Sequence, residues 1–233
     1  MSYLRGKTIL IIDDELELLE LLEVIFTQAG AKTFTAFNGQ EGLRQFYAGQ
    51  PDLVIVDLMM PQMDGWQVCR NIRQLSDTPI IILTALDMDK AIIRGLDAGA
   101  DEFVTKPVSP DVLLARARAT LRRAELPSTT QKPVSYNDGY LVIDRDKRQL
   151  SVDGAPVKLS ATEYLLLTYL LDHAGRVLAF GQILAKVWGN EYRENIDYVH
   201  VYISRLRSKI EKDPRQPAYL LTEHGIGYRF EKQ

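Results

Sequence analysis

The sequence predicts an α/β protein with two domains: a doubly wound, five-stranded parallel sheet, followed by a smaller α+β domain. Over the first half of the 233 residues, five short apolar runs alternate with five helical patterns, which implies right-handed crossovers and a parallel sheet covered on both faces. The strand order 2-1-3-4-5 fits this pattern. A polar, proline-containing segment without periodicity then precedes short strands, three helices and a hairpin. We therefore expect domains at 1–124 and 137–233, joined by a linker at 125–136.

Composition narrows the class of protein. A hydrophobic fraction of 46% with 25% charged residues is typical of a soluble globular protein. The sequence has no apolar run near the roughly 20 residues that span a bilayer, and acidic residues directly follow the first apolar stretch, unlike a signal peptide. The single cysteine excludes an internal disulfide and agrees with a reducing compartment. These features predict a cytoplasmic protein without a membrane partner.

The first domain is expected to hold its strands and helices in strict alternation. Branched apolar runs predict the strands, and the helices are marked by helical spacing, by an Asn38 to Glu41 start signal and by glycine stops. The expected strands are Thr8–Ile12, Thr33–Ala36, Leu53–Val56, Ile80–Leu83 and Glu102–Thr105. The expected helices are 16–29, 38–48, 66–75, 87–98 and 110–123.

Polar residues stand where these strands end, at the sheet edge where ligands bind in open parallel sheets. Asp57 ends the third strand, in LVIVDLMMPQMDG, and Asp13 with Asp14, Thr84 and Lys106 end three others. Taken alone, Asp57 could equally be an ordinary turn residue. Three neighbouring carboxylates repel one another unless a cation holds them, and Mg²⁺ accepts such oxygens while leaving room for phosphate. The set predicts phosphoryl transfer onto Asp57.

At these residues the chain resembles the receiver domain of two-component response regulators. The acidic pair, DLMMPQMDG, the Thr84-Ala85 step and TKP follow the order of that family over about residues 5 to 124. The resemblance implies that a sensor histidine kinase phosphorylates Asp57. It also implies a magnesium site in which Asp14 binds directly, Asp13 binds through water and the Met59 carbonyl completes the ligands. Thr84 and Phe103 would form the switch, although plain core packing explains Phe103 equally well.

The resemblance further implies a homodimer that forms on phosphorylation. Relatives dimerise through charge pairs on a helix-strand-helix face, and two pairs match that pattern here. Ile92 and Val112 stand where relatives have a basic and an acidic residue, so a hydrophobic contact could replace that pair. The matching charge pairs are Asp101 with Arg118 and Glu102 with Arg116.

The second domain begins with short strands at 140–144, 149–152 and 157–159. Ser160 with Glu163 predicts a capping box that starts a helix at 161–172, and further helices are expected at 180–187 and 194–211. Up to Ala124 there are 13 basic and 17 acidic residues, against 15 and 14 afterwards, a weak hint of an anionic partner.

Angular spacing separates two faces of the predicted helix 194–211. One narrow stripe should be buried, and the opposite face combines donors, an apolar group and small residues that suit a major groove. A merely solvated face remains the alternative. The stripe holds Val199, Ile203, Leu206 and Ile210. The opposite face holds Asp197, Val201, Ser204, Arg205 and Ser208, flanked by His200, Tyr202 and Arg207.

Two strands at 219–222 and 227–230 should form a hairpin beside this helix, able to reach the adjacent minor groove. With YISRLRSKIEKDP and LLTEHGIGYRF, residues 137 to 231 resemble the winged-helix effector domain of the OmpR/PhoB family, with some features of the Kdp-type regulators. The resemblance implies that double-stranded DNA is bound by the 194–211 helix and by His224 and Tyr228. His224 stands where several relatives have an arginine. The loop Trp188 to Arg193 would lie where relatives touch RNA polymerase.

The resulting hypothesis is a phosphorylation-dependent transcription regulator that dimerises on paired half-sites. A phosphohydrolase with an aspartyl-phosphate intermediate is one alternative, but the second domain uses the length that a substrate cap would need. A DNA-binding regulator that works without phosphorylation is another, and the sequence leaves it open.

Overall fold

The computed structural model describes residues 4–85, 99–125 and 136–233. The chain divides into two compact units, Met1–Ala124 and Glu125–Gln233, which we call unit 1 and unit 2 and describe separately. The helix expected at 87–98, with Ile92, and most of the expected linker lie outside the described residues.

Unit 1 contains a five-stranded sheet in the order β2-β1-β3-β4-β5, and each pair of neighbours is parallel. The predicted order is therefore confirmed. In parallel sheets the ladder places equivalent strand ends side by side, so the polar residues that end these strands share one edge. The strands are β1 Thr8–Ile12, β2 Lys32–Ala36, β3 Leu53–Asp57, β4 Ile80–Thr84 and β5 Glu102–Thr105.

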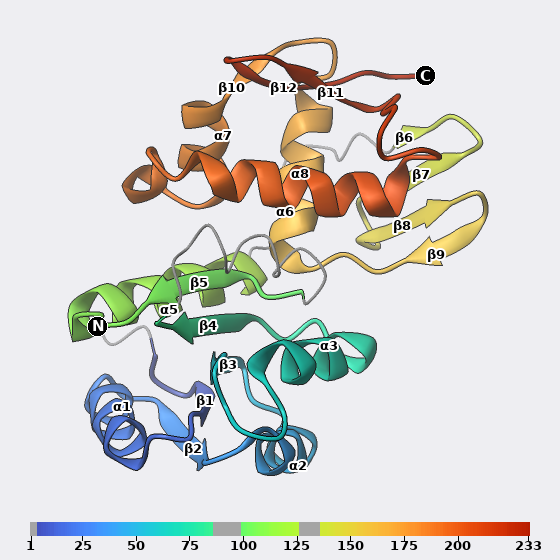
Figure 1. Ribbon diagram of the computed structural model, residues 1–233. Helices are drawn as coiled ribbons and strands as arrows, with labels where there is room; N and C mark the ends of the chain where they lie inside the picture. Colours follow the sequence, from blue (N-terminus) through green and yellow to red (C-terminus); the bar gives the residue numbers. More distant parts are fainter. Residues whose placement is uncertain (1–3, 86–98, 126–135) are drawn as a thin grey trace. The chain divides into compact units, whose positions relative to one another are not determined.

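Helices cover both faces of this sheet (Figure 1). Apolar side chains of α1 and α5 pack on one face, where Phe26 and Leu113 belong to one buried cluster with Ile11 and Ile55. Side chains of α2 and α3 pack on the other, where Phe46 and Ile72 join Val54 and other strand residues. The helices are α1 Leu16–Gln28, α2 Gly39–Gly49, α3 Gly65–Leu75 and α5 Pro110–Glu125.

Side-chain caps fix where several helices begin. The Asn38 side chain accepts the Glu41 backbone N–H at the start of α2 at 2.8 Å, as its spacing predicted. Ser160 and Glu163 form the predicted capping box in unit 2. Neighbouring residues in the sequence thus fix the starts of these two helices.

Unit 2 contains two small antiparallel sheets. The first has the order β6-β7-β8-β9 and the second the order β10-β12-β11. The first consists of β6 Tyr136–Asn137, β7 Leu141–Asp144, β8 Gln149–Val152 and β9 Ala155–Val157. The second consists of β10 Leu178–Ala179, β11 Leu220–Glu223 and β12 Gly227–Phe230.

Three of these strands differ from the sequence prediction. β6 was not predicted, because Tyr136 was assigned to the linker and the first strand was expected at 140–144. β9 lies two residues earlier than expected, because the two-residue turn Asp153-Gly154 returns the chain directly, pairing Val152 with Ala155. β10 was not predicted. It is only two residues long and is defined by pairing with Tyr228 and Gly227 of β12, so its own sequence carries little signal.

The helices of unit 2 pack around a shared apolar core. They are α6 Ala161–Asp172, α7 Phe180–Val187 and α8 Ile196–Ile210, with a 3₁₀ turn at Asn190–Tyr192. The predicted buried stripe of α8 is confirmed, because Val199, Ile203, Leu206 and Ile210 are at most 1% exposed. The long helix is thereby fixed on one side by packing.

Candidate functional site

Three of the predicted strand-end residues meet at the carboxyl edge of the unit 1 sheet. The Lys106 ammonium Nζ lies 2.7 Å from Asp13 Oδ2 and 2.7 Å from Asp57 Oδ1. The second Asp57 oxygen accepts the Met59 backbone N–H at 2.5 Å, and Asp13 Oδ1 accepts the Glu15 N–H. Segments far apart in the sequence therefore supply one polar cluster, which we call the strand-end cluster.

Thr84 and Phe103 lie in the strands that flank this cluster. Thr84 is fully buried. Its carbonyl accepts the Lys106 backbone N–H at 2.7 Å, so the end of β4 holds the Lys106 backbone in position. Phe103 is 4% exposed and packs 6.0 Å from the Trp66 ring. Its switch role stays a prediction.

The strand-end cluster holds two carboxylates and one ammonium group, and its negative charge is unfavourable because the carboxylates are buried. Asp13 and Asp57 are both buried, and one lysine serves both carboxylates. Burial raises the pKa of Asp13, and its bonds to Lys106 and Glu15 only partly offset that effect. For Lys106, burial lowers the pKa, but its hydrogen bonds to Asp13 and Asp57 outweigh burial and raise it overall. The two carboxylates hold the ammonium firmly, and they retain capacity for a further cation.

The donors at this edge fit a magnesium ion. The carboxylates of Asp13 and Asp57, which are buried, the exposed carboxylate of Asp14 and the Met59 carbonyl all carry oxygen atoms, and Mg²⁺ needs only one or two carboxylates besides water and phosphate. Among the described residues no three acidic, histidine or cysteine side chains are gathered as a metal cluster. The expected convergence of three carboxylates is thus corrected: Lys106 joins Asp13 to Asp57, while Asp14 faces solvent.

Two carboxylates of the predicted dimer face form ion pairs within unit 1. Asp101 is 3% exposed, and its carboxylate pairs with Arg73 of α3 and accepts the Ile80 N–H. Glu102 is fully buried and pairs with Arg116 and with Arg123, which lies about two helical turns further along α5. Both carboxylates thus have partners within unit 1, and their part in a dimer stays a prediction.

Val112 and Arg118, which also belong to the predicted dimer face, are exposed. Val112 is 46% exposed and Arg118 is also open to solvent. Their part in a dimer stays a prediction.

On α8 the exposed face is narrower than the sequence predicted. His200 and Ser204 are exposed as expected, but Val201, Tyr202 and Arg205 are buried, at 5%, 1% and 6% exposure. The Tyr202 ring packs 5.1 Å from the buried Trp188, and the Arg205 guanidinium lies over the Tyr202 ring. The angular spacing along α8 predicted these residues to be exposed, because it contains no information about side chains from other segments, such as the Trp188 ring that packs on Tyr202.

Arg207 is occupied by the β11–β12 hairpin. Its guanidinium donates to the Leu220 carbonyl and to the Thr222 hydroxyl, and it lies over the Tyr228 ring. The Tyr228 hydroxyl in turn lies 2.7 Å from His200 Nδ1. The role of Thr222 was missed, since only the strand register reveals it.

His224 is exposed at the turn of this hairpin. Its exposure agrees with the predicted DNA contact without testing it.

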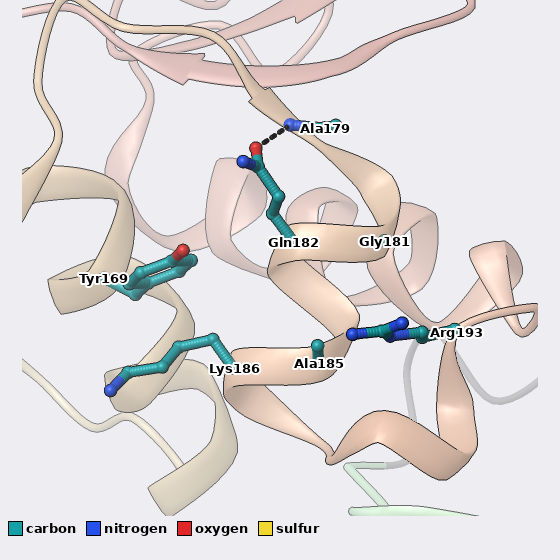
Figure 2. Close-up of a pocket in the computed structure, with 7 residues that line it drawn as sticks. All are labelled: Tyr169, Ala179, Gly181, Gln182, Ala185, Lys186 and Arg193. Atoms are coloured by element: carbon teal, nitrogen blue, oxygen red, sulfur yellow. Dashed lines mark hydrogen bonds between the residues drawn. The ribbon is translucent and has the colours of Figure 1, made fainter.

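A pocket of about 620 Å³ opens between α6, α7 and Arg193 (Figure 2). The Tyr169 ring of α6 faces Gln182 and Lys186 of α7, and the Gln182 side chain turns back to accept the Ala179 N–H. The cations Lys186 and Arg193 are its charged lining residues, so it suits an anionic group. Within the loop from Trp188 to Arg193, the rings of Trp188 and Tyr192 are buried, and they anchor the loop.

Two family models match the chain. The response regulator receiver domain matches residues 9–118, and the C-terminal domain of transcriptional regulatory proteins matches residues 154–230. The chain therefore belongs to the two-component response regulators with an OmpR/PhoB-type DNA-binding domain, a family of transcription regulators. Among the described residues, no helix is long and apolar enough to cross a membrane.

Individual relatives match over nearly the whole chain. The probable transcriptional regulator ycf27 of Cyanophora paradoxa is 43% identical over 98% of this chain and 98% of its own. The transcriptional regulatory protein KdpE of Mycobacterium tuberculosis is 40% identical over 96% of this chain and 98% of its own. Relatives with the Kdp name are thus present, as the sequence suggested, alongside ycf27 regulators of similar identity.

Solved structures agree with this assignment. The response regulator DrrB, an OmpR/PhoB homologue of Thermotoga maritima, is 30% identical with a TM-score of 0.51, covering 97% of this chain and 99% of its own. A mutant of RitR is 25% identical with a TM-score of 0.80, covering 98% of this chain and all of the other. Both resemblances extend over receiver and effector together.

Proposed function

We propose that this response regulator is switched by phosphorylation of Asp57 by a sensor histidine kinase, and that the phosphorylated form dimerises on paired DNA half-sites. The observation that carries the proposal is the strand-end cluster. A buried carboxylate lies 2.7 Å from a lysine at the ligand-binding edge of a doubly wound sheet, which is the arrangement that phosphoryl transfer needs.

The residues of the cluster have distinct roles in this transfer. An Asp57 carboxylate oxygen attacks phosphorus in line, and the bond from phosphorus to the kinase histidine nitrogen breaks. Lys106 is already within 2.7 Å of Asp57 and would bind an equatorial phosphoryl oxygen. The Thr84 hydroxyl supplies a further donor, as the family's switch mechanism implies.

Magnesium is the cofactor of this proposal. Asp13, Asp14, Asp57 and the Met59 carbonyl would hold it, and it would neutralise charge on the phosphoryl oxygens. The raised pKa of Asp13, caused first by burial, supports the proposal, because a divalent cation would compensate a carboxylate that the lysine serves only in part.

Phosphorylation is tested with a small phosphodonor such as acetyl phosphate, read as the mass of the intact full chain. Asp57→Asn should abolish Mg²⁺-dependent labelling. Asp52→Asn is the matched control, because Asp52 directly precedes β3 at its opposite end and should be labelled like the wild type. Undiminished labelling of the Asp57 variant would disprove the assignment.

DNA binding is proposed to use α8 and the β11–β12 hairpin. The exposed His200 and Ser204 lie on the side of α8 opposite its buried stripe. Ser204→Glu should weaken binding of the full chain to a duplex selected from a random pool by at least tenfold, because it brings a negative charge to the phosphates. Gln149→Glu, exposed on β8 of the same unit, adds the same charge elsewhere and should change little. Equal effects of both variants would refute the assignment of α8.

Dimerisation is tested by light scattering of the full chain with and without beryllofluoride, a phosphoryl mimic. A change from monomer to dimer that Asp57→Asn abolishes is expected. An unchanged mass would instead favour a regulator that works without phosphorylation.

RNA polymerase is proposed as the partner of the pocket in Figure 2. The charged residues that line it among those described are Lys186 and Arg193, so it suits an acidic segment of the polymerase. Arg193→Glu should abolish activated transcription in a purified system while leaving DNA affinity unchanged. Loss of DNA affinity instead would exclude this role.

A further inference from the structure

Lys209, in the last turn of α8, is bonded to the segment where α6 begins. Its ammonium Nζ lies 2.6 Å from Glu163 Oε2 and 3.0 Å from the Lys158 carbonyl oxygen. Glu163 stands in the first turn of α6, and Lys158 directly follows the end of β9. One side chain of α8 therefore holds both ends of the connection between β9 and α6. We call this set of contacts the α8 anchor.

The Glu163 carboxylate that binds Lys209 is buried and fixed in place. Glu163 is 3% exposed, and its Oε2 also accepts the Ser160 backbone N–H at 2.8 Å in the capping box of α6. A buried carboxylate needs an opposite charge, and among the described ion pairs Lys209 supplies it. Because the capping box fixes where this carboxylate lies, the ion pair fixes where the end of α8 lies.

Two cations flank the buried stripe of α8 on opposite sides. Side chains two residues apart on a helix point about 200° apart, so Arg207 and Lys209 lie on different sides of α8. The buried stripe, which includes Ile210, lies between them. Arg207 donates to the Leu220 carbonyl of β11 at 3.0 Å, whereas Lys209 donates toward α6. The last turn of α8 is thus bonded from both sides, and rotation of the helix about its axis would disturb both contacts.

The same contacts determine which side of α8 stays open. His200, Ser204 and Ser208 are exposed and lie four residues apart, so they form one stripe on the side opposite the buried residues. A rotation of α8 would change the direction in which this stripe points. Sequence readout by hydrogen bonds to base edges tolerates only small displacements. An anchor that prevents rotation therefore contributes to discrimination between DNA sequences.

We infer that Lys209 is a positioning residue for DNA recognition, which holds α8 at a fixed rotation through Glu163 instead of contacting a DNA phosphate. The link to DNA rests on the binding proposed above for α8, whereas the anchor itself does not. A lysine in the last turn of a helix is also favoured by the helix dipole, and that effect needs no partner. Only the anchor predicts that replacing Glu163 has the same consequence as replacing Lys209.

The position of α8 is tested without DNA by NMR of the tryptophan indole N–H groups in the full chain. The Trp188 ring packs edge to face on Tyr198 and Tyr202 of α8, with ring centres 6.0 and 5.1 Å away, so its signal depends on where these rings lie. Lys209→Met and Glu163→Gln should each move the Trp188 signal in the same direction, and Lys209→Arg should restore it. An unmoved signal in either of the first two variants would overturn the anchor.

Arg145→Met is the matched control. Arg145 also joins a carboxylate to a backbone carbonyl, at 2.7 Å from Asp172 and 2.8 Å from the Thr168 oxygen. Its loss removes the same charge from unit 2 and breaks the same kinds of contact, but these contacts do not involve α8. The Trp188 signal should therefore stay in place. A movement as large as in Lys209→Met would show a general loosening of unit 2 and would contradict the inference.

The consequence for DNA is tested with a duplex selected from a random pool and a scrambled duplex of equal length. In Lys209→Met the ratio of the two affinities should fall roughly fivefold or more, the low end of what one base contact contributes. The slope of log affinity against log salt should not change. A phosphate contact would instead lower that slope by about 1 and leave the ratio unchanged, and this result would refute the positioning role.

Glu163→Gln changes the charge in the opposite direction. Glutamine also serves in a capping box, so α6 still begins at the same place while the ion pair is lost. The added positive charge favours DNA of any sequence, yet the affinity ratio should fall as it does in Lys209→Met. The double variant should lower the ratio no further than either single variant, because both remove one interaction.

Two further variants should keep the wild-type ratio. Lys209→Arg should do so because a guanidinium can donate to both acceptors, and Arg145→Met because its contacts lie away from α8. A ratio that stays high in Glu163→Gln, or falls in Arg145→Met, would exclude the inference. If no duplex can be selected, the proposed DNA recognition fails, and the NMR result still decides the anchor.

Discussion

Replacing Lys106 by methionine should destabilise unit 1 strongly, and the loss should depend on magnesium and pH. The substitution keeps an apolar stem but removes the ammonium that lies 2.7 Å from both Asp13 and Asp57. Removing one partner of a buried ion pair costs about 3 to 5 kcal/mol. Because 21% of the Lys106 side chain is exposed, we expect the lower end of that range, about 3 kcal/mol at pH 7.5 without divalent cations.

Magnesium should recover part of this loss. A ligand that binds the folded state raises the unfolding free energy according to its affinity, and a site without Lys106 offers Mg²⁺ less repulsion. At about 10 mM MgCl₂ the variant should therefore gain more stability than the wild type.

Lowering the pH should also reduce the difference in unfolding free energy between the Lys106→Met variant and the wild type. A buried carboxyl whose pKa is raised in the folded state, as for Asp13, binds more protons folded than unfolded, so its destabilising effect fades as pH falls. Without Lys106, the ionised Asp13 carboxylate loses its ion pair and destabilises the folded state more. The gap between variant and wild type should thus be smaller at about pH 5 than at pH 7.5.

Urea unfolding followed by tryptophan fluorescence provides the assay. The chain has two tryptophans, Trp66 in unit 1 and Trp188 in unit 2, so a Trp188→Phe background makes Trp66 the sole reporter in both proteins. Lys7→Met is the matched control: Lys7 pairs with Asp52 at 3.4 Å in a partly exposed site and should change stability by less than about 1 kcal/mol, without magnesium dependence. A loss at Lys106 that is equally small, or constant across magnesium and pH, would refute the reasoning.

Further substitutions test the hairpin. Arg207→Ala should lower the unfolding free energy of unit 2 by about 2 kcal/mol, since two charge-assisted hydrogen bonds are lost. It should leave the salt dependence of DNA binding unchanged. If the slope of log affinity against log salt fell by about 1, Arg207 would contact a phosphate directly. Gly227→Ala should prevent β10 from pairing, because the added Cβ would lie 1.8 Å from the Leu178 carbonyl; thermal unfolding measures the loss. At Gly181, in α7, an added Cβ meets no atom within 4 Å, so alanine should stabilise by about 0.5 to 1 kcal/mol, and a loss there comparable to Gly227→Ala would contradict the steric argument.

Local signals were sufficient for most of the fold. Apolar runs, caps and breakers are encoded in neighbouring residues, and the order of the parallel sheet follows from right-handed crossovers. The strand-end cluster was predictable for the same reason, because parallel strands align their carboxyl ends. β10 was missed, since a two-residue strand is created by its partner rather than by its own sequence.

The errors concern the partners of charged and aromatic side chains. Asp101 and Glu102 were assigned to charge pairs of a dimer face, and the sequence did not reveal their ion pairs with Arg73 of α3 and Arg123 of α5. Tyr202 read as part of an exposed face, but the Trp188 ring covers it. The spacing of apolar residues shows on which side of its helix or strand a residue lies. It does not show which other helix, strand or loop packs against that side.

The sequence by itself determined the two-domain α/β architecture, the strand order and the residues at the carboxyl edge of the sheet, because periodicity and chain connectivity are local properties. Only the tertiary structure decided how those residues are paired: one lysine between two buried carboxylates, and an arginine that binds a hairpin carbonyl. Such pairings depend on atoms brought within hydrogen-bond distance by packing between distant segments, and no spacing along the chain records that distance.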